Sequence, residues 1–93
     1  MTIGPDQRFT VASDVHARSF DGETVLVDLR RGDYYGLNEL GARLWEGLLA
    51  GKSAREVAAL VAPRFEVPLE RLLDDLVALT GELAERGLIV AAE

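Results

Sequence analysis

The stretch RGDYYGLNELGARLWEGL, residues 31–48, contains the change of pattern that decides the fold. It begins with a turn and continues as a short aromatic run, in which alternation puts Tyr35 on one face and Tyr34 on the other. We expect Tyr35 to be the tyrosine that anchors this strand to the core. From Asn38 onward, apolar residues recur every three or four positions, which is the spacing of one helix face, and Asn is a favoured helix N-cap. The strand is therefore predicted to end at Leu37 and to run directly into a helix.

Two further strands are expected upstream of this stretch. In ETVLVDLR, residues 23–30, the period of two is that of a half-buried strand, and we expect Val25, Val27 and Leu29 to form its inner face. FTVASDVHARSF, residues 9–20, alternates less regularly, and an Asp-Gly pair supplies a tight hairpin turn between the two runs. The first third of the chain thus predicts an antiparallel meander whose last strand has an open edge.

Three helices are predicted after the strands. The first ends before Gly51, a residue suited to the left-handed position that follows a helix. The second begins with SARE, residues 53–56, where serine and glutamate form a capping box, and it ends at Pro63. The third opens at Pro68, which is tolerated in a first turn, and ends at Gly87. The predicted fold class is α+β, with a three-stranded antiparallel sheet followed by three helices.

Length and composition limit the class of protein. With 93 residues, 48% of them hydrophobic, the chain can form one core, and we expect a single domain over residues 1–93 with its core at about residues 11–90. The sequence contains no cysteine, which excludes disulfides and thiolate ligands. Its net charge of −6 opposes nucleic-acid binding, which needs clustered cations. Without a signal-peptide region or a long apolar run, we expect a cytoplasmic protein that does not enter a membrane.

No set of residues predicts catalysis, a metal or a cofactor. His16 is the sole histidine and is interpreted as a residue on the surface of a strand. Asp74 and Asp75 project about 100° apart on a helix and therefore do not form an acid–base pair. GLLAGKS resembles a phosphate-binding loop, but it is one residue short and follows a helix, so a helix end and a capping box explain it better. We expect no enzyme activity.

Two classes of function remain. A winged-helix DNA-binding regulator also combines a small sheet with three helices, one of which enters the major groove. The exposed arc of the third helix opposes this class, because its acidic residues outnumber Arg71 and Arg86 and would repel phosphates. These acidic residues are Glu70, Asp74, Asp75, Glu82 and Glu85. A peptide-binding module is the other class, since the open edge of the last strand can accept an extended peptide by strand addition.

Several motifs, by their order and spacing, resemble the PqqD-like family of recognition elements for ribosomally synthesised and modified peptides (RiPPs). The resemblance is strongest to the small stand-alone members found in lasso peptide biosynthesis, and it covers about residues 11–90. It rests on the tyrosine-rich strand leading into LN..G..LW, on S..EVA in the second helix, and on D.......L...GLI beginning at Asp75. The resemblance implies a winged-helix-like arrangement of three strands and three helices.

The same resemblance implies a non-catalytic adaptor. Members of the family bind the leader segment of a precursor peptide as an added strand between the third strand and the third helix, and present it to separate enzymes. Carried over by position, the implied peptide-binding residues are Asp33, Tyr34, Tyr35, Gly36, Leu37, Leu72, Leu73, Asp75, Leu76 and Leu79. As a bare recognition domain, the protein is expected to need a leader peptidase and an ATP-dependent cyclase in trans. Quinone-cofactor precursors and other modified peptides remain alternative substrates.

Overall fold

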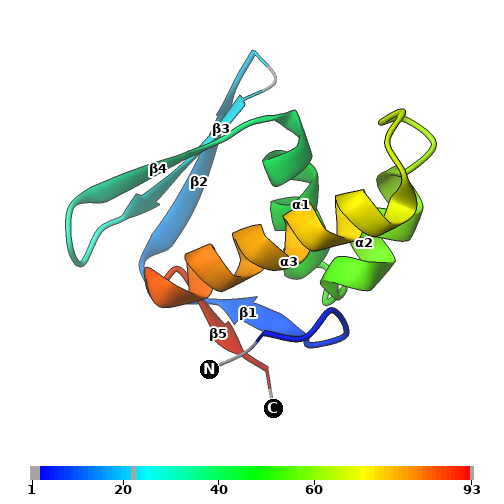
Figure 1. The fold of residues 1–93 in the computed structure, drawn as a ribbon. Coiled ribbons are helices and arrows are strands. Elements are labelled where there is room, and N and C mark those ends of the chain that lie inside the picture. Colours follow the sequence, from blue (N-terminus) through cyan, green and yellow to red (C-terminus); the bar gives the residue numbers. More distant parts are fainter. Residues whose placement is uncertain (1–2, 22, 93) are drawn as a thin grey trace.

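The computed structural model describes residues 3–21 and 23–92, and it has the predicted α+β fold. Figure 1 shows its elements, which in chain order are β1 (Phe9–Val11), β2 (Val15–Phe20), β3 (Glu23–Asp28), β4 (Asp33–Leu37), α1 (Glu39–Leu49), α2 (Ala54–Val61), α3 (Leu69–Glu85) and β5 (Ile89–Ala91). Strands β2, β3 and β4 form an antiparallel sheet in that order. The predicted three-stranded sheet and three helices are therefore confirmed.

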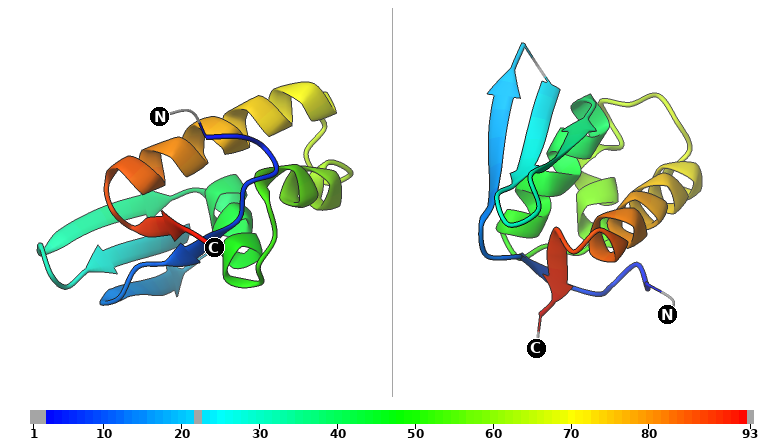
Figure 2. Two further views of the ribbon diagram at one scale, coloured as in Figure 1. Left: turned by 90° about the horizontal axis from the view of Figure 1, so that it is seen from below. Right: turned by 90° about the vertical axis from the view of Figure 1, so that its left-hand side faces the viewer.

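The run expected to form the first strand is divided into two strands. Asp14 has a φ of 65°, a left-handed conformation that aspartate tolerates better than most residues, and it turns the chain between β1 and β2. β1 then pairs antiparallel with β5, with Phe9 opposite Ala91. The right-hand view of Figure 2 shows this pair below the larger sheet. The chain therefore contains a second, two-stranded sheet that the sequence did not predict.

The inner face of β3 is the opposite of the one predicted. The residues of this strand that are buried against the helices are Thr24, Leu26 and Asp28. Val25 and Val27 are only half-buried on the outer face, and Leu29 is 63% exposed. Helices cover only one face of the sheet, and a shift of one residue exchanges the faces of a strand. The prediction was wrong because it assigned the core to the face with more aliphatic residues.

The predicted helix ends are confirmed. The side chain of Asn38 accepts a hydrogen bond from the amide of Gly41 at 2.9 Å at the start of α1, and a capping box of Ser53 and Glu56 begins α2. Gly51 follows α1 with a φ of 83°, a conformation that glycine adopts without steric cost. Gly87 has the same role after α3.

Helix α1 is the centre of the core. It contacts β1, β3, β4, α2 and α3, and Figure 1 shows α3 passing in front of it with the larger sheet to the left. Trp45 is 3% exposed in α1, and Leu44 and Leu48 are buried beside it. Gly47 allows α2 to approach closely, because a Cβ atom there would collide with a methyl group of Val57. The core therefore lies between the sheet and the three helices.

Residues 3–21 and 23–92 contain neither a membrane-spanning helix nor a metal-binding cluster. None of the helices in this part is long and apolar enough to span a bilayer. The same residues contain no group of three or more potential ligands that could hold a metal ion. His16 lies exposed on β2, as expected.

Candidate functional site

Strand β4 forms one edge of the larger sheet. Two cavities separate this strand from α3, which faces it. Among the described residues β4 pairs only with β3, so its other edge is open. Both cavities are lined by residues of β4 and of α3 or its C-terminal end. The candidate site is the cleft that these two cavities form along the open edge.

The direction of the backbone groups of β4 follows from the pairing of β3. The amide of Leu29 donates to the carbonyl of Asp14 at 2.9 Å, so the backbone of Leu29 points toward the β2 side. Backbone direction alternates along a strand, and Asp28, which pairs with Asp33, therefore points toward β4. By the same alternation along β4, we infer that the amides and carbonyls of Tyr34 and Gly36 point to the open edge. These groups are free to bond an added strand.

The first cavity has a volume of about 420 Å³ and is called here the Leu76 cavity. Its lining comes from β4, α3 and the beginning of α1, and consists of Tyr35, Gly36, Leu37, Asn38, Leu40, Gly41, Asp75, Leu76 and Leu79. Leu76 is fully buried at its apolar base, whereas Asp75 is exposed. The cavity therefore combines an apolar base with an acidic group.

The second cavity lies at the other end of β4 and has a volume of about 290 Å³. This Asp28 cavity is lined by Asp28, Arg31, Asp33, Tyr34, Tyr35, Glu85, Arg86 and Leu88. Most of these side chains are charged, so its chemistry differs from that of the Leu76 cavity. The cleft thus has an apolar end and a charged end.

Tyr35 lines both cavities and lies between them. Its ring is half-buried, whereas Tyr34 is 74% exposed, which confirms the predicted inner tyrosine. Burial raises the pKa of the Tyr35 hydroxyl, and the nearby carboxylate of Glu82 raises it further, while Arg86 acts in the opposite direction. Tyr35 therefore stays neutral at physiological pH, and its hydroxyl lies beside the carboxylate of Glu82.

The turn between β3 and β4 is attached to the end of α3. Arg30 donates from Nη2 to the carbonyl of Gly87 at 3.2 Å, and Arg31 donates from Nη1 to the carbonyl of Arg86 at 3.3 Å. Carbonyls at the C-terminal end of a helix lack partners within the helix, and cations there also interact favourably with its dipole. These two contacts fix the distance between β4 and α3 at the charged end of the cleft.

Of the residues implied by the resemblance, the structure brings six together around the Leu76 cavity: Tyr35, Gly36, Leu37, Asp75, Leu76 and Leu79. Asp33 and Tyr34 line the Asp28 cavity instead. Leu72 is buried in the core, Leu73 packs against it, and neither lines the cleft.

Several lining residues were missed by sequence reasoning. At the apolar end they are Asn38, Leu40 and Gly41, which follow β4 directly and were read only as the start of a helix. At the charged end they are Asp28, Arg31, Glu85, Arg86 and Leu88. No local signal identifies this second group, because the fold brings together a turn and a helix end that lie far apart in the sequence.

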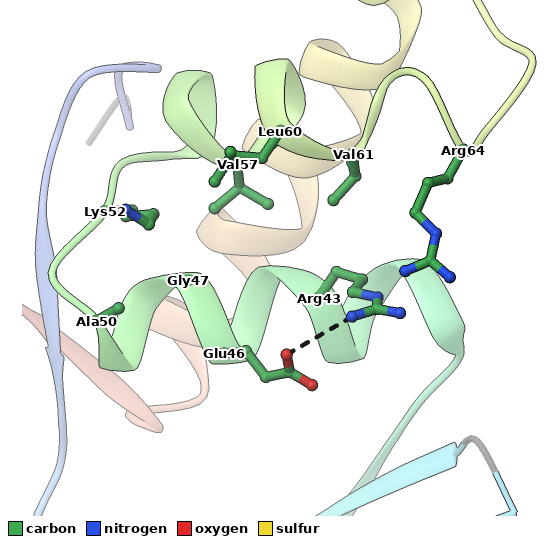
Figure 3. A pocket seen from close by; sticks show the side chains of 9 residues that line it. All are labelled: Arg43, Glu46, Gly47, Ala50, Lys52, Val57, Leu60, Val61 and Arg64. Carbon is green, nitrogen blue, oxygen red and sulfur yellow. Dashed lines mark ion pairs between the residues drawn. The ribbon is translucent and has the colours of Figure 1, made fainter.

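Another cavity, of about 270 Å³, lies between α1 and α2 and is shown in Figure 3. Arg43 pairs there with Glu46 at 3.9 Å, and Lys52 and Arg64 also contribute to the lining. It shares no residue with the cleft beside β4. None of the residues implied by the resemblance lies in it.

The chain is similar to known proteins in both sequence and fold. The family model of coenzyme PQQ synthesis protein D (PqqD) matches residues 23–89. A solved structure of TbiB1 in complex with the TbiA(beta) leader peptide is similar with a TM-score of 0.81 and 27% sequence identity, over 90% of this chain and 98% of that chain. A structure of lasso peptide synthetase B1 complexed with the leader peptide has a TM-score of 0.82 and 30% identity, over 89% and 98% of the two chains. Among curated proteins, none matches this chain.

Proposed function

Because this chain belongs to the PqqD family, we propose that it is a non-catalytic adaptor that binds the leader segment of a precursor peptide in lasso peptide biosynthesis. Both similar solved structures contain a leader peptide, which supports this role. The observation that carries the proposal is the open edge of β4, which faces two cavities backed by α3.

The leader binds by strand addition to β4. Its backbone bonds the free amides and carbonyls of Tyr34 and Gly36, which supply affinity without reading the leader sequence. Alternate leader side chains point into the cleft and are read by the cavities. The contacting set comprises Asp33 to Leu37 on the strand and Asp75, Leu76 and Leu79 on the helix. Leu72 and Leu73 support this helix from the core.

The other free edge of the sheet is less suited to a peptide. Strand β2 is also an edge strand, but every residue after Val15 in it is exposed. A peptide added there would lack the covering helix that α3 provides at β4. Backbone bonds that stay open to water contribute little net free energy, so the covered edge is the better site.

A winged-helix DNA-binding role has no support from the exposed side of α3. Its acidic residues Glu70, Asp74, Glu82 and Glu85 are all exposed, and they would face the phosphates of a duplex.

The adaptor works in trans with a leader peptidase and an ATP-dependent cyclase. We propose that residues 1–93 act as one peptide-recognition domain that presents the leader while those enzymes act on the precursor. A PqqD-type role for another modified peptide is the alternative, supported by the family match alone. A cytoplasmic location stays a prediction.

Fluorescence anisotropy tests the proposed function. The panel contains the labelled TbiA(beta) leader, other lasso leaders, a quinone-cofactor precursor leader, a scrambled leader and a labelled DNA duplex. We expect saturable binding of at least one lasso leader and none of the scrambled peptide. Saturable binding of the quinone-cofactor leader alone would favour the alternative pathway. Tight binding of the duplex with no response to any peptide would overturn the adaptor role.

A further inference from the structure

The carboxylate of Asp28 is only half satisfied. Its Oδ1 accepts hydrogen bonds from the backbone amide of Arg30 at 3.0 Å and from Nε of the same residue at 3.4 Å. Its Oδ2 is buried and has no hydrogen-bond partner among the described residues. Asp28 is 1% exposed, and it lines the Asp28 cavity. A buried charged oxygen without a donor is unfavourable, so this atom is placed to receive one.

The Asp28 carboxyl group is ionised at neutral pH. Burial raises its pKa, but the hydrogen bonds and charge of Arg30, together with the backbone amide of Arg31, lower it more, and the net shift is downward. An ionised carboxylate can only accept hydrogen bonds. The group that completes Oδ2 must therefore be a donor.

The other charged groups of the cavity also leave acceptors free. Asp33 and Glu85 are exposed at its rim and form no ion pair with any described residue. The arginines are already engaged, since Arg31 donates to a carbonyl and Arg86 contacts Glu82 at 3.6 Å and the ring of Tyr35. The lining therefore carries three carboxylates, those of Asp28, Asp33 and Glu85, against two guanidinium groups, and its net charge is negative.

We propose that the Asp28 cavity is a subsite for a basic side chain, lysine or arginine, of the bound peptide. This site rests on the proposed function, because it reads a residue of the strand added to β4. Directly paired residues on neighbouring strands point to the same face, so the peptide residue opposite Asp33 points into the Asp28 cavity. The residue opposite Leu37 points into the Leu76 cavity. The recognised segment therefore carries a basic and an apolar side chain four positions apart, about 13 Å along a strand.

A peptide library tests the site without knowledge of the natural leader. Random 12-residue peptides displayed on yeast are selected with the wild-type protein, and peptides that also bind Gly36→Pro are discarded. We expect the remaining peptides to share a lysine or arginine four positions from an apolar residue. Replacing that basic residue by norleucine should weaken binding to the wild type about tenfold or more, as loss of a charge-assisted hydrogen bond does.

Asp28→Asn supplies the matched variant, since it keeps the shape of the side chain and removes its charge. With this variant, the difference in affinity between the basic peptide and its norleucine form should be much smaller than with the wild type. Thermal melting establishes that Asp28→Asn is folded, and if it is not, Asp33→Asn and Glu85→Gln at the exposed rim replace it. These rim variants should each reduce the preference for the basic peptide.

The outcomes separate the two proposals. Selected peptides that depend on Gly36 but tolerate norleucine would overturn the basic subsite, leave strand addition intact, and assign Oδ2 to an ordered water. A library that yields no peptide sensitive to Gly36→Pro would overturn both strand addition and the subsite.

Discussion

The guanidinium of Arg86 lies over the ring of Tyr35, 4.8 Å from its centroid. This contact joins the end of α3 to the inner face of β4, and it lies where the two cavities of the cleft meet. A cation–π contact at a partly exposed site contributes about 0.5–1 kcal/mol, so a bound peptide can displace it at small cost. Tyr35, which lines both cavities, is thus held to the end of α3 by a weak contact.

Gly36→Pro should abolish leader binding with little loss of helix content. Proline removes the amide that points to the open edge and places its ring there. Gly36→Ala is the matched control, because a Cβ atom at this position meets no other atom within 4 Å and the amide remains. Anisotropy titration and circular dichroism of both variants provide the measurement. If folded Gly36→Pro binds its leader with unchanged affinity, the peptide does not use this edge, and DYYGL serves only as the connection into α1.

Asp75→Ala should weaken leader binding modestly. Asp75 is exposed and lines the Leu76 cavity, and an exposed charge pair contributes about 1 kcal/mol or less, which corresponds to fivefold at most. If it attracts a basic leader, added salt should slow association more than it speeds dissociation. Asp74→Ala makes the same charge change at an exposed residue outside the cleft and should have the smaller effect. If the association rate measured by stopped flow does not change with salt concentration, Asp75 does not speed the association of the leader.

The isolated protein should leave a precursor peptide chemically unchanged. It contains no cysteine and a single histidine, and the described residues form no metal-binding group. Mass spectrometry after incubation of precursor with the pure protein should therefore show an unaltered mass. Reproducible cleavage or cyclisation under these conditions would contradict the adaptor role.

Two of the helical glycines, Gly47 and Gly81, should respond in opposite directions to alanine. At Gly47 the added methyl group collides with Val57, and such overpacking costs about 1–3 kcal/mol of the free energy of unfolding. At Gly81 the nearest neighbour, a side-chain carbon of Ile3, is 3.8 Å away, so Gly81→Ala should gain up to about 1 kcal/mol of helix propensity. Urea unfolding measures both changes. Unchanged stability of Gly47→Ala would mean that α2 can shift away from α1.

The contribution of Glu56 to the free energy of unfolding should decrease in acid. The hydrogen bond from Arg8, and then that from the amide of Ser53, lower the pKa of Glu56 from 4.5 to about 2. Because the folded-state pKa is the lower one, ionised Glu56 stabilises the fold above pH 4.5, and this contribution disappears as the pH falls toward 2. The stability difference between wild type and Glu56→Gln, measured by urea unfolding, should therefore narrow over this range. Arg8→Ala should show the same narrowing, and a constant difference for both variants would exclude this linkage.

The elements that local chemistry determines could be predicted from the sequence. Asn38 and Ser53 cap helices through their own side chains, and Gly51 adopts a conformation that depends on its neighbours alone. Alternation within β4 likewise identified Tyr35 as the inner tyrosine. These features require no knowledge of the rest of the fold.

The features set by contacts between distant segments could not be predicted. Val25 and Val27 are more apolar than Thr24 and Asp28, yet the helices cover the other face of β3. A helical wheel identifies the apolar side of α3, but it does not separate the part covered by other helices, at Leu72, from the part left to the cleft. The charged end of the cleft could not be predicted for both of these reasons, because its residues come from the inner face of β3 and from the end of α3.

The pairing of β1 with β5 has a practical consequence for experiments on this protein. Phe9 lies opposite Ala91, so the two end segments of the chain run side by side, and Figure 1 shows them below α3, whereas β4 lies above it. A fluorophore, a biotin or an immobilising tag attached through a flexible linker after β5 thus starts on the side away from the cleft. The amide of Ala92 also donates to the carbonyl of Arg8 at 2.9 Å, so a short linker can join these two residues. A circularly permuted chain made in this way, with new ends in the loop between α2 and α3, is a feasible reagent for attaching a reporter away from β1 and β5.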